Sequence, residues 1–101
     1  MIPVLVVIPT YNESESIRSL LTRLDMARKS ISQKFDIDIL LVDDDSPDKT
    51  ADIAKSMNLS GFSILNRKVK SGLGPAYLAG FKQGLIGNYQ YFVEMDADLS
   101  H

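Results

Sequence analysis

The sequence predicts an α/β fold with a mainly parallel sheet, and three observations support this prediction. Short apolar runs alternate along the chain with segments in which apolar residues recur at helical spacing. The first two runs, PVLVVI and ILLV, are apolar on both faces, as expected of parallel strands covered by helices on each side. Polar residues follow every run directly. This order implies β-α-β units joined by right-handed crossovers.

The first unit is expected to be a strand at residues 3–8 followed by a helix that starts near residue 14. The strand is apolar throughout and rich in β-branched residues. Asn12, with Glu15 three residues later, is expected to cap the helix. One apolar stripe at spacing i, i+3, i+4 and i+7 marks its buried face, namely Ile17, Leu20, Leu21 and Leu24.

The later elements repeat this alternation. A second strand is expected at 37–42, after which SPDKT breaks the chain and a short helix follows at 51–57. The third strand is expected at 61–65. Pro75 suits a first helical turn, and the helix at 76–84 carries a face of small residues. The fourth strand is expected at 91–95.

Composition narrows the function classes. The 101 residues are 45% hydrophobic and 24% charged, which fits one globular domain over residues 1–101. A formal net charge of −2 gives no support for binding nucleic acid through its phosphates. The absence of cysteine excludes a disulfide framework, a thiolate zinc site and a cysteine nucleophile within these 101 residues. The apolar runs are far shorter than the roughly 20 residues needed to span a bilayer, and no basic segment precedes the first one.

Ligands of parallel sheets bind outside the carboxyl ends of the strands. Four polar segments are expected there, PTYNE at 9–13, DDDS at 43–46, NRK at 66–68 and DAD at 96–98. A purely structural module has no reason to place polar groups at all four strand ends. The segments therefore mark a candidate ligand site.

Two of these segments are acidic, and each has a structural alternative. Turn chemistry accounts for one or two of the acids at 43–45 but not for three beside a buried strand, because neighbouring like charges raise one another's pKa. Asp96 and Asp98 fit a solvated strand end. They also fit a cation site, since residues i and i+2 point the same way with small Ala97 between them. Mg²⁺ or Mn²⁺ held in this manner keeps waters and takes other ligands from a substrate diphosphate.

Other candidates carry less information. Gly72-Leu73-Gly74 is not a dinucleotide fingerprint, because a third glycine and a position directly after the first strand are missing. A loop with a helix start accounts for it equally well. The basic segment 67–70 fits a phosphate contact or a solvated loop. Tyr77 and Phe81, four residues apart, are expected in the core, and His101 has no assigned role.

Together, VVIPTYNE, LLVDDDSPDKT, RKVKSGLGPAYLAGF and VEMDADLSH resemble the N-terminal nucleotide-sugar-binding part of family 2 glycosyltransferases with the GT-A fold. More narrowly, they resemble the dolichyl-phosphate and polyprenol monophosphate mannosyltransferases. The similarity covers all 101 residues. It implies a Rossmann-like half of a GT-A domain. The Asp-x-Asp motif lies near the middle of that catalytic domain, so we expect this chain to be an incomplete domain that stops after the fourth strand.

The resemblance also implies roles for individual residues. The first-strand loop lies against the nucleoside, the acidic pair after the second strand contacts base and ribose, and the glycine loop lies near the donor. The matching donor-binding positions are Pro9, Tyr11, Glu13, Asp43, Asp44, Lys70, Gly72, Leu73 and Gly74. Asp45 and Lys49 depart from the family, which more often has Asn and Gly there, as in DDNSPDGT.

The implied reaction is an inverting displacement with Asp96 and Asp98 as the metal-binding and catalytic pair and Mg²⁺ or Mn²⁺ as cofactor. The implied donor is a nucleoside diphosphate sugar, with GDP-mannose favoured. The implied acceptor is a polyprenyl phosphate, used by the full-length protein at the cytoplasmic side of a membrane. Another donor, or a sugar hydroxyl as acceptor, remains an alternative. The fragment alone is expected to be inactive.

Two other function classes share some of these features. ILLVDDD is similar to the acidic pocket of receiver domains, which bind magnesium and accept a phosphoryl group, but there the Asp pair follows the first strand. A nucleotidyltransferase would carry a glycine-rich and basic loop where this chain has PTYNE.

Overall fold

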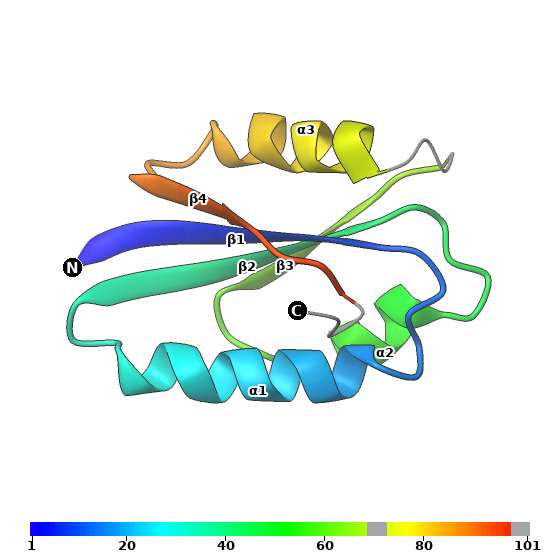
Figure 1. Ribbon diagram of the computed structural model, residues 1–101, viewed down its shortest axis with the longest axis horizontal. Helices are drawn as coiled ribbons and strands as arrows, with labels where there is room; N and C mark the ends of the chain where they lie inside the picture. The colour runs from blue at the N-terminus through cyan, green and yellow to red at the C-terminus, as the bar shows by residue number, and fades with distance from the viewer. Residues whose placement is uncertain (69–72, 98–101) are drawn as a thin grey trace.

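The computed structural model describes residues 1–68 and 73–97 (Figure 1). Within them, strands and helices alternate as predicted, and all strand pairs are parallel in one sheet of order β3-β2-β1-β4. The α/β prediction is therefore confirmed. The elements are β1 (Ile2–Thr10), α1 (Ile17–Ser30), β2 (Phe35–Asp43), α2 (Thr50–Ser56), β3 (Phe62–Asn66), α3 (Leu73–Gly84) and β4 (Tyr91–Glu94).

The sheet lies between two helical layers, with α1 and α2 on one face and α3 on the other (Figure 1). Strands β2 and β3 extend the sheet on one side of β1, whereas β4 lies on the opposite side. The order in which successive strands are added to the sheet therefore reverses at β1. In open parallel sheets, the carboxyl ends of the strands beside such a reversal form the usual binding crevice. Here that position lies beyond the ends of β1 and β4.

The core forms two clusters because both faces of β1 and β2 are covered. On the face of α1 and α2, Val6 and Ile8 alternate with Leu5 and Val7 on the face of α3. This alternation accounts for continuous apolar strands, as predicted. Burial of each such side chain contributes roughly 1.5–3 kcal/mol. Fully buried residues include Ile8, Ile17, Leu21, Ile39, Leu41, Val7 and Val42.

Helix α3 approaches the sheet closely through its small residues. A Cβ at Gly80 would overlap the side chain of Val7, and one at Gly84 would lie 2.6 Å from Leu5 Cδ2. Ala76, on the same face, is 1% exposed. The predicted small-residue face is therefore the packing face of α3.

Strand β1 continues past its predicted end and includes Pro9 and Thr10. Residues of a parallel strand direct their hydrogen bonds alternately to the two neighbours. The carbonyl of Thr10 accepts from Asp44 on the β2 side, so the missing N–H of Pro9 would face β4. The β4 ladder pairs only as far as Glu94, opposite Val7. Pro9 lies beyond the paired part of β4, so its missing N–H interrupts no bond of that ladder.

The predicted cap of α1 is wrong. This helix has Ser16 at its N-cap, without a side-chain capping bond, and begins at Ile17. Asn12 instead has a φ of 55° and lies in the preceding loop, where its N–H donates to Ser46 Oγ at 3.0 Å. Residues 11–16 follow the surface of the β2–α2 loop before the helix can start.

Smaller boundary differences have local causes. Strand β3 starts one residue later than expected because Gly61, with a φ of 57°, belongs to the turn. Helix α3 starts at Leu73, so that Pro75 is its third residue and stays within the first turn. Strand β4 ends at Glu94 rather than at residue 95. In the part of the chain that is described, no helix has the length and apolar character to cross a bilayer.

Candidate functional site

Within residues 1–68 and 73–97, the predicted polar segments lie along the carboxyl edge of the sheet. The register pairs Thr10 with Asp43 and Asp43 with Asn66, so β1, β2 and β3 end at the same level. The N–H of Met95 donates to Val7 O at 3.1 Å, which leads the chain after β4 to this edge as well. Residues far apart in sequence therefore share one edge.

Asp43 is buried, at 2% exposure, and its carboxylate is engaged within the protein. Its Oδ1 accepts hydrogen bonds from Thr10 Oγ1 at 2.7 Å and from Ser46 Oγ at 2.6 Å. Its Oδ2 accepts the N–H of Ser46 at 3.0 Å. A buried carboxylate needs such donors, because burial without them is costly. Asp43 thereby fastens the end of β1 to the loop after β2.

Asp44 has different surroundings. It is 5% exposed, and its Oδ1 lies 3.4 Å from Arg67 Nη1. The two atoms form an ion pair, but Asp44 Oδ1 accepts no hydrogen bond from the described residues. The opposite charge compensates the carboxylate while an acceptor position remains. Of the two predicted acids, Asp44 is the one with such a position.

The segment SPDKT holds the loop that follows β1. The N–H groups of residues 12–14 donate in turn to Ser46 Oγ at 3.0 Å, Thr50 Oγ1 at 2.9 Å and Asp48 Oδ2 at 3.0 Å. Burial opposes ionisation of Asp48, but the hydrogen bonds from Thr50 and Ser14 outweigh it and hold its pKa below the usual value. By itself, the sequence SPDKT predicts only a break in the chain. Its alternating oxygen-bearing side chains, at positions 46, 48 and 50, were the signal for this function.

The other described residues predicted to bind the donor lie in the first-strand loop and at the start of α3. Pro9 is buried at the end of β1, and Tyr11 and Glu13 are half-buried in the loop held by SPDKT. Leu73 and Gly74 are the first two residues of α3. Lys70, Gly72 and Asp98 lie outside the described residues.

Asp96 and Ala97 are anchored on opposite sides of the sheet. Tyr77 of α3 donates its hydroxyl to Asp96 Oδ1 at 3.1 Å. Ala97, 4% exposed, packs in the cluster of α1, and its carbonyl accepts the hydroxyl of Ser16 at 3.1 Å. The two contacts fix the backbone between α1 and α3.

Tyr77 has two roles, of which one was expected. Its ring stacks on that of Phe81, with centroids 6.3 Å apart, as predicted for a core residue. The sequence does not predict its hydroxyl contact with Asp96. Burial, followed by the hydrogen bond and charge of Asp96 and the charge of Glu94, raises the pKa of Tyr77 to about 12. The hydroxyl therefore stays protonated at neutral pH and donates to the carboxylate.

The predicted acidic pair fits a magnesium or manganese ion that takes only one or two carboxylates from the protein. Residues 1–68 and 73–97 contain no group of three His, Cys, Asp or Glu side chains arranged to hold a metal ion. Mg²⁺ is, however, commonly held by only one or two carboxylates, with waters and substrate phosphates completing its coordination. Asp96 would supply one hard oxygen ligand at the carboxyl edge, and Asp98, the second acid of the predicted pair, lies outside the described residues.

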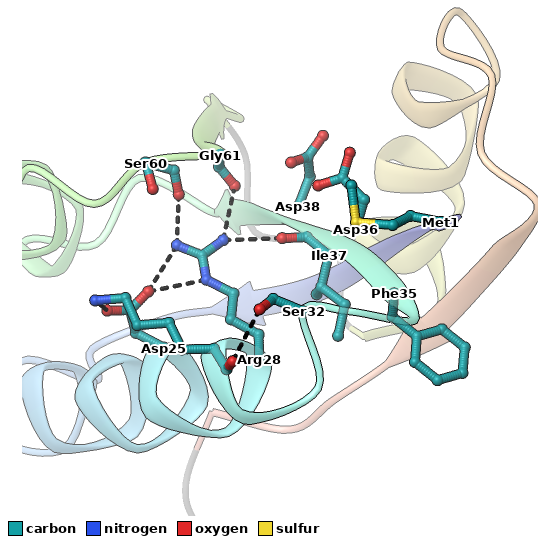
Figure 2. Close-up of a pocket in the computed structure, with 11 residues that line it drawn as sticks. Met1, Asp25, Arg28, Ser32, Phe35, Asp36, Ile37, Asp38, Ser60 and Gly61 are labelled. Atoms are coloured by element: carbon teal, nitrogen blue, oxygen red, sulfur yellow. Dashed lines mark hydrogen bonds and ion pairs between the residues drawn. The ribbon is translucent and has the colours of Figure 1, made fainter.

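A hollow of about 380 Å³ lies at the opposite, amino edge of the sheet (Figure 2). Its central residue is Arg28, which is 8% exposed. The guanidinium donates to Ile37 O at 2.9 Å, to Gly61 O at 3.3 Å, to the carbonyl of Ser60 and to Asp25 Oδ1 at 2.9 Å (Figure 2). These contacts occupy Arg28 within the protein. It fastens α1 to β2 and to the turn before β3, so this hollow is not the candidate site.

Comparisons with known proteins show what this chain resembles. Residues 5–101 match the model of the family described as Glycosyl transferase family 2. The chain is 48% identical over 100 residues to an undecaprenyl-phosphate mannosyltransferase of Micrococcus luteus, covering 97% of this chain and 39% of that protein. It is 44% identical over 100 residues to a polyprenol monophosphomannose synthase of Mycolicibacterium smegmatis, covering 96% and 36%. It is 38% identical over 97 residues to a dolichol-phosphate mannosyltransferase of Pyrococcus furiosus, covering 95% and 26%. The chain thus spans less than half the length of each relative.

Proposed function

The chain belongs to glycosyl transferase family 2, and from this premise we propose that the complete protein transfers a sugar from a nucleoside diphosphate to a polyprenyl phosphate. One observation carries the proposal. The family match runs from residue 5 to residue 101 and includes both acidic segments, and Asp44 and Asp96 lie at the carboxyl edge of the sheet. Ligands of open parallel sheets usually bind at this edge.

The nucleoside contact is assigned to Asp44, with Asp43 holding the loop around it. Asp44 Oδ1 is buried and accepts no hydrogen bond from the described residues, so an N–H of a base or a ribose hydroxyl would satisfy it. A carboxylate accepts well from the N1–H and the 2-amino group of guanine. GDP is therefore the proposed nucleotide, and the names of the relatives support mannose as the sugar.

The two departures from the family concern backbone conformation. Asp45 and Lys49 have φ values of 57° and 65°, the left-handed region in which Asn and Gly are most favourable. Both side chains are exposed. Their identities therefore bear on the strain of the loop, and the proposal of GDP-mannose does not depend on them.

Asp96 and Asp98 would hold Mg²⁺ or Mn²⁺. Such an ion acts as a Lewis acid that stabilises the departing nucleoside diphosphate. Asp96 is held at the end of β4 through the contacts of Tyr77 and of neighbouring Ala97. The protein's contribution is to present this carboxylate beside the loop that SPDKT fastens.

The proposed acceptor follows from the relatives, whose names include undecaprenyl phosphate, polyprenol and dolichol phosphate. A phosphate oxygen is already ionised near neutral pH, so no general base is required. The pH profile of transfer should accordingly lack the limb that a base would impose. A lipid acceptor also places the full-length protein at a membrane surface, which we propose is the cytoplasmic one.

Calorimetry on the full-length protein tests the donor assignment. With Mn²⁺ present, GDP should bind more tightly than UDP, and Asp44→Asn should weaken GDP binding by roughly tenfold or more, as expected for a hydrogen bond to a charged group. Asp36→Asn, at the amino edge, is the matched control and should leave the affinity unchanged. Tighter binding of UDP would refute a GDP-sugar donor.

The metal assignment needs its own variant. Asp98→Ala should abolish the part of nucleotide binding that depends on Mn²⁺ while leaving the circular dichroism spectrum unchanged. Unaltered calorimetric affinity would contradict the role of this residue. Labelling by acetyl phosphate, which the proposal does not expect, would favour the receiver-like alternative.

A further inference from the structure

We propose that Tyr77 is a positioning residue that orients the carboxylate of Asp96 toward the metal and diphosphate. The inference rests on the proposed function, because it takes Asp96 as a metal ligand. Its basis is the hydrogen bond from the Tyr77 hydroxyl to Asp96 Oδ1, at 3.1 Å, between α3 and the end of β4.

The ring of Tyr77 is fixed by the packing of α3. Its neighbour Ala76 is 1% exposed against the sheet. The Tyr77 ring stacks on Phe81 with an interplanar angle of 25°, and Phe81 meets Phe92 edge to face at 5.7 Å. Phe92 belongs to β4, the strand that leads to Asp96. The helix and the strand that carry the two partners are therefore joined by one aromatic series.

Rotation of the Asp96 carboxylate is what the hydroxyl restrains. A carboxylate at a strand end can turn about its Cα–Cβ and Cβ–Cγ bonds, and a donor at a fixed position selects one orientation. Metal ligands are generally held by outer partners of this kind, whose loss lowers metal affinity about 10- to 100-fold. A phenol suits the position because it supplies a donor without adding a charge.

The molecule provides a matched pair for comparison. Tyr89 donates its hydroxyl to Asp38 Oδ2 at 2.6 Å, and its ring meets Phe92 at 6.1 Å. Tyr89 and Tyr77 are both half-buried. Asp38, however, lines the hollow at the amino edge of the sheet (Figure 2). Removal of the Tyr89 hydroxyl thus breaks a similar tyrosine–carboxylate hydrogen bond but leaves the surroundings of Asp96 unchanged.

The test compares Tyr77→Phe with Tyr89→Phe in the full-length protein. Mn²⁺ affinity is measured by electron paramagnetic resonance in the presence of whichever nucleotide, GDP or UDP, binds more tightly. Tyr77→Phe should weaken Mn²⁺ binding about tenfold or more, whereas Tyr89→Phe should change it less than twofold. Equal Mn²⁺ affinities in the two variants would overturn the positioning role.

A third variant separates this inference from the proposed function. Asp96→Asn should weaken Mn²⁺ binding, and adding Tyr77→Phe to it should have no further effect, because the hydroxyl acts through the carboxylate. If Asp96→Asn leaves Mn²⁺ affinity unchanged, the metal assignment fails and the inference with it. If Asp96→Asn weakens binding and Tyr77→Phe does not, only the inference fails.

Discussion

The hydroxyl of Thr10 donates a 2.7 Å hydrogen bond to Oδ1 of Asp43, and this contact joins the carboxyl ends of β1 and β2 inside the protein. Thr10 is 4% exposed, and both oxygens of Asp43 are engaged. Asp43, the last residue of β2, therefore supports the candidate site, while its neighbour Asp44 retains an acceptor position.

Removal of this hydroxyl should destabilise the protein. Thr10→Val keeps the volume of the side chain but takes one donor from a buried carboxylate, at a cost of about 1.5–3 kcal/mol. Urea unfolding measures the loss. Thr22→Val is the control, because the Thr22 hydroxyl bonds Arg18 O on an exposed surface of α1, and it should cost less than about 0.5 kcal/mol. Equal losses in the two variants would contradict the structural role of the Thr10 bond.

Lys49 should be replaceable by glycine with a gain in stability. Its φ of 65° strains a residue that has a Cβ by about 1–2 kcal/mol, part of which is offset by the greater freedom of glycine in the unfolded chain. Lys49→Gly should therefore raise the free energy of unfolding by roughly 0.5–1 kcal/mol. Lys55→Gly, within α2, should lower it by a similar amount. A loss of stability in Lys49→Gly would show that the lysine side chain has a contribution of its own.

Asp25 should make stability depend on acid pH. The hydrogen bond from Lys29, together with the hydrogen bond and charge of Arg28, outweighs burial and holds the pKa of Asp25 below its usual value of 3.8. Because the folded pKa is the lower one, its contribution is complete above about pH 4 and is lost as the pH falls through the folded pKa. Asp25→Asn should thus be destabilising at pH 7, and its difference from the unmodified protein should shrink below pH 4. A difference that stays constant across this range would refute the ion pair as its source.

Substitutions of Gly74 and Gly80 should distinguish an effect on donor binding from an effect on stability. A Cβ at Gly74 meets nothing within 4 Å, so Gly74→Ala should leave stability unchanged or raise it by up to about 1 kcal/mol. Gly80→Ala should cost roughly 1–3 kcal/mol through overlap with Val7. In the full-length protein, Gly74→Ala should nevertheless weaken nucleotide-sugar binding in calorimetry, since the family's glycine loop lies near the donor. Unchanged donor affinity would remove Gly74 from the site.

The fold was predictable because its signal is local. Apolar runs such as PVLVVI identify strands buried on both faces, and the helical spacing of Ile17 and Leu21 identifies the helix between them. The details that the sequence did not predict depend on partners far along the chain. The Thr10 hydroxyl is bonded to Asp43, 33 residues later, and the N–H of Asn12 is bonded to Ser46, 34 residues later.

The candidate site likewise has features that the sequence predicts and features that it does not. The acidic residues themselves were visible as strand-end motifs, but the different surroundings of Asp43 and Asp44 were not. Tyr77 fits the helical apolar pattern, which predicts a core position. Only the three-dimensional structure brings its hydroxyl to Asp96, 19 residues away.

Sugar transfer by the full-length protein is the most direct test of the central claim. The protein is incubated with radiolabelled GDP-mannose, Mn²⁺ and undecaprenyl phosphate in detergent, with undecaprenol lacking the phosphate as the matched control. We predict that label enters the lipid fraction only with the phosphorylated lipid and is released from it by mild acid. Label that instead appears on a sugar hydroxyl, or that enters undecaprenol equally well, would contradict the claim.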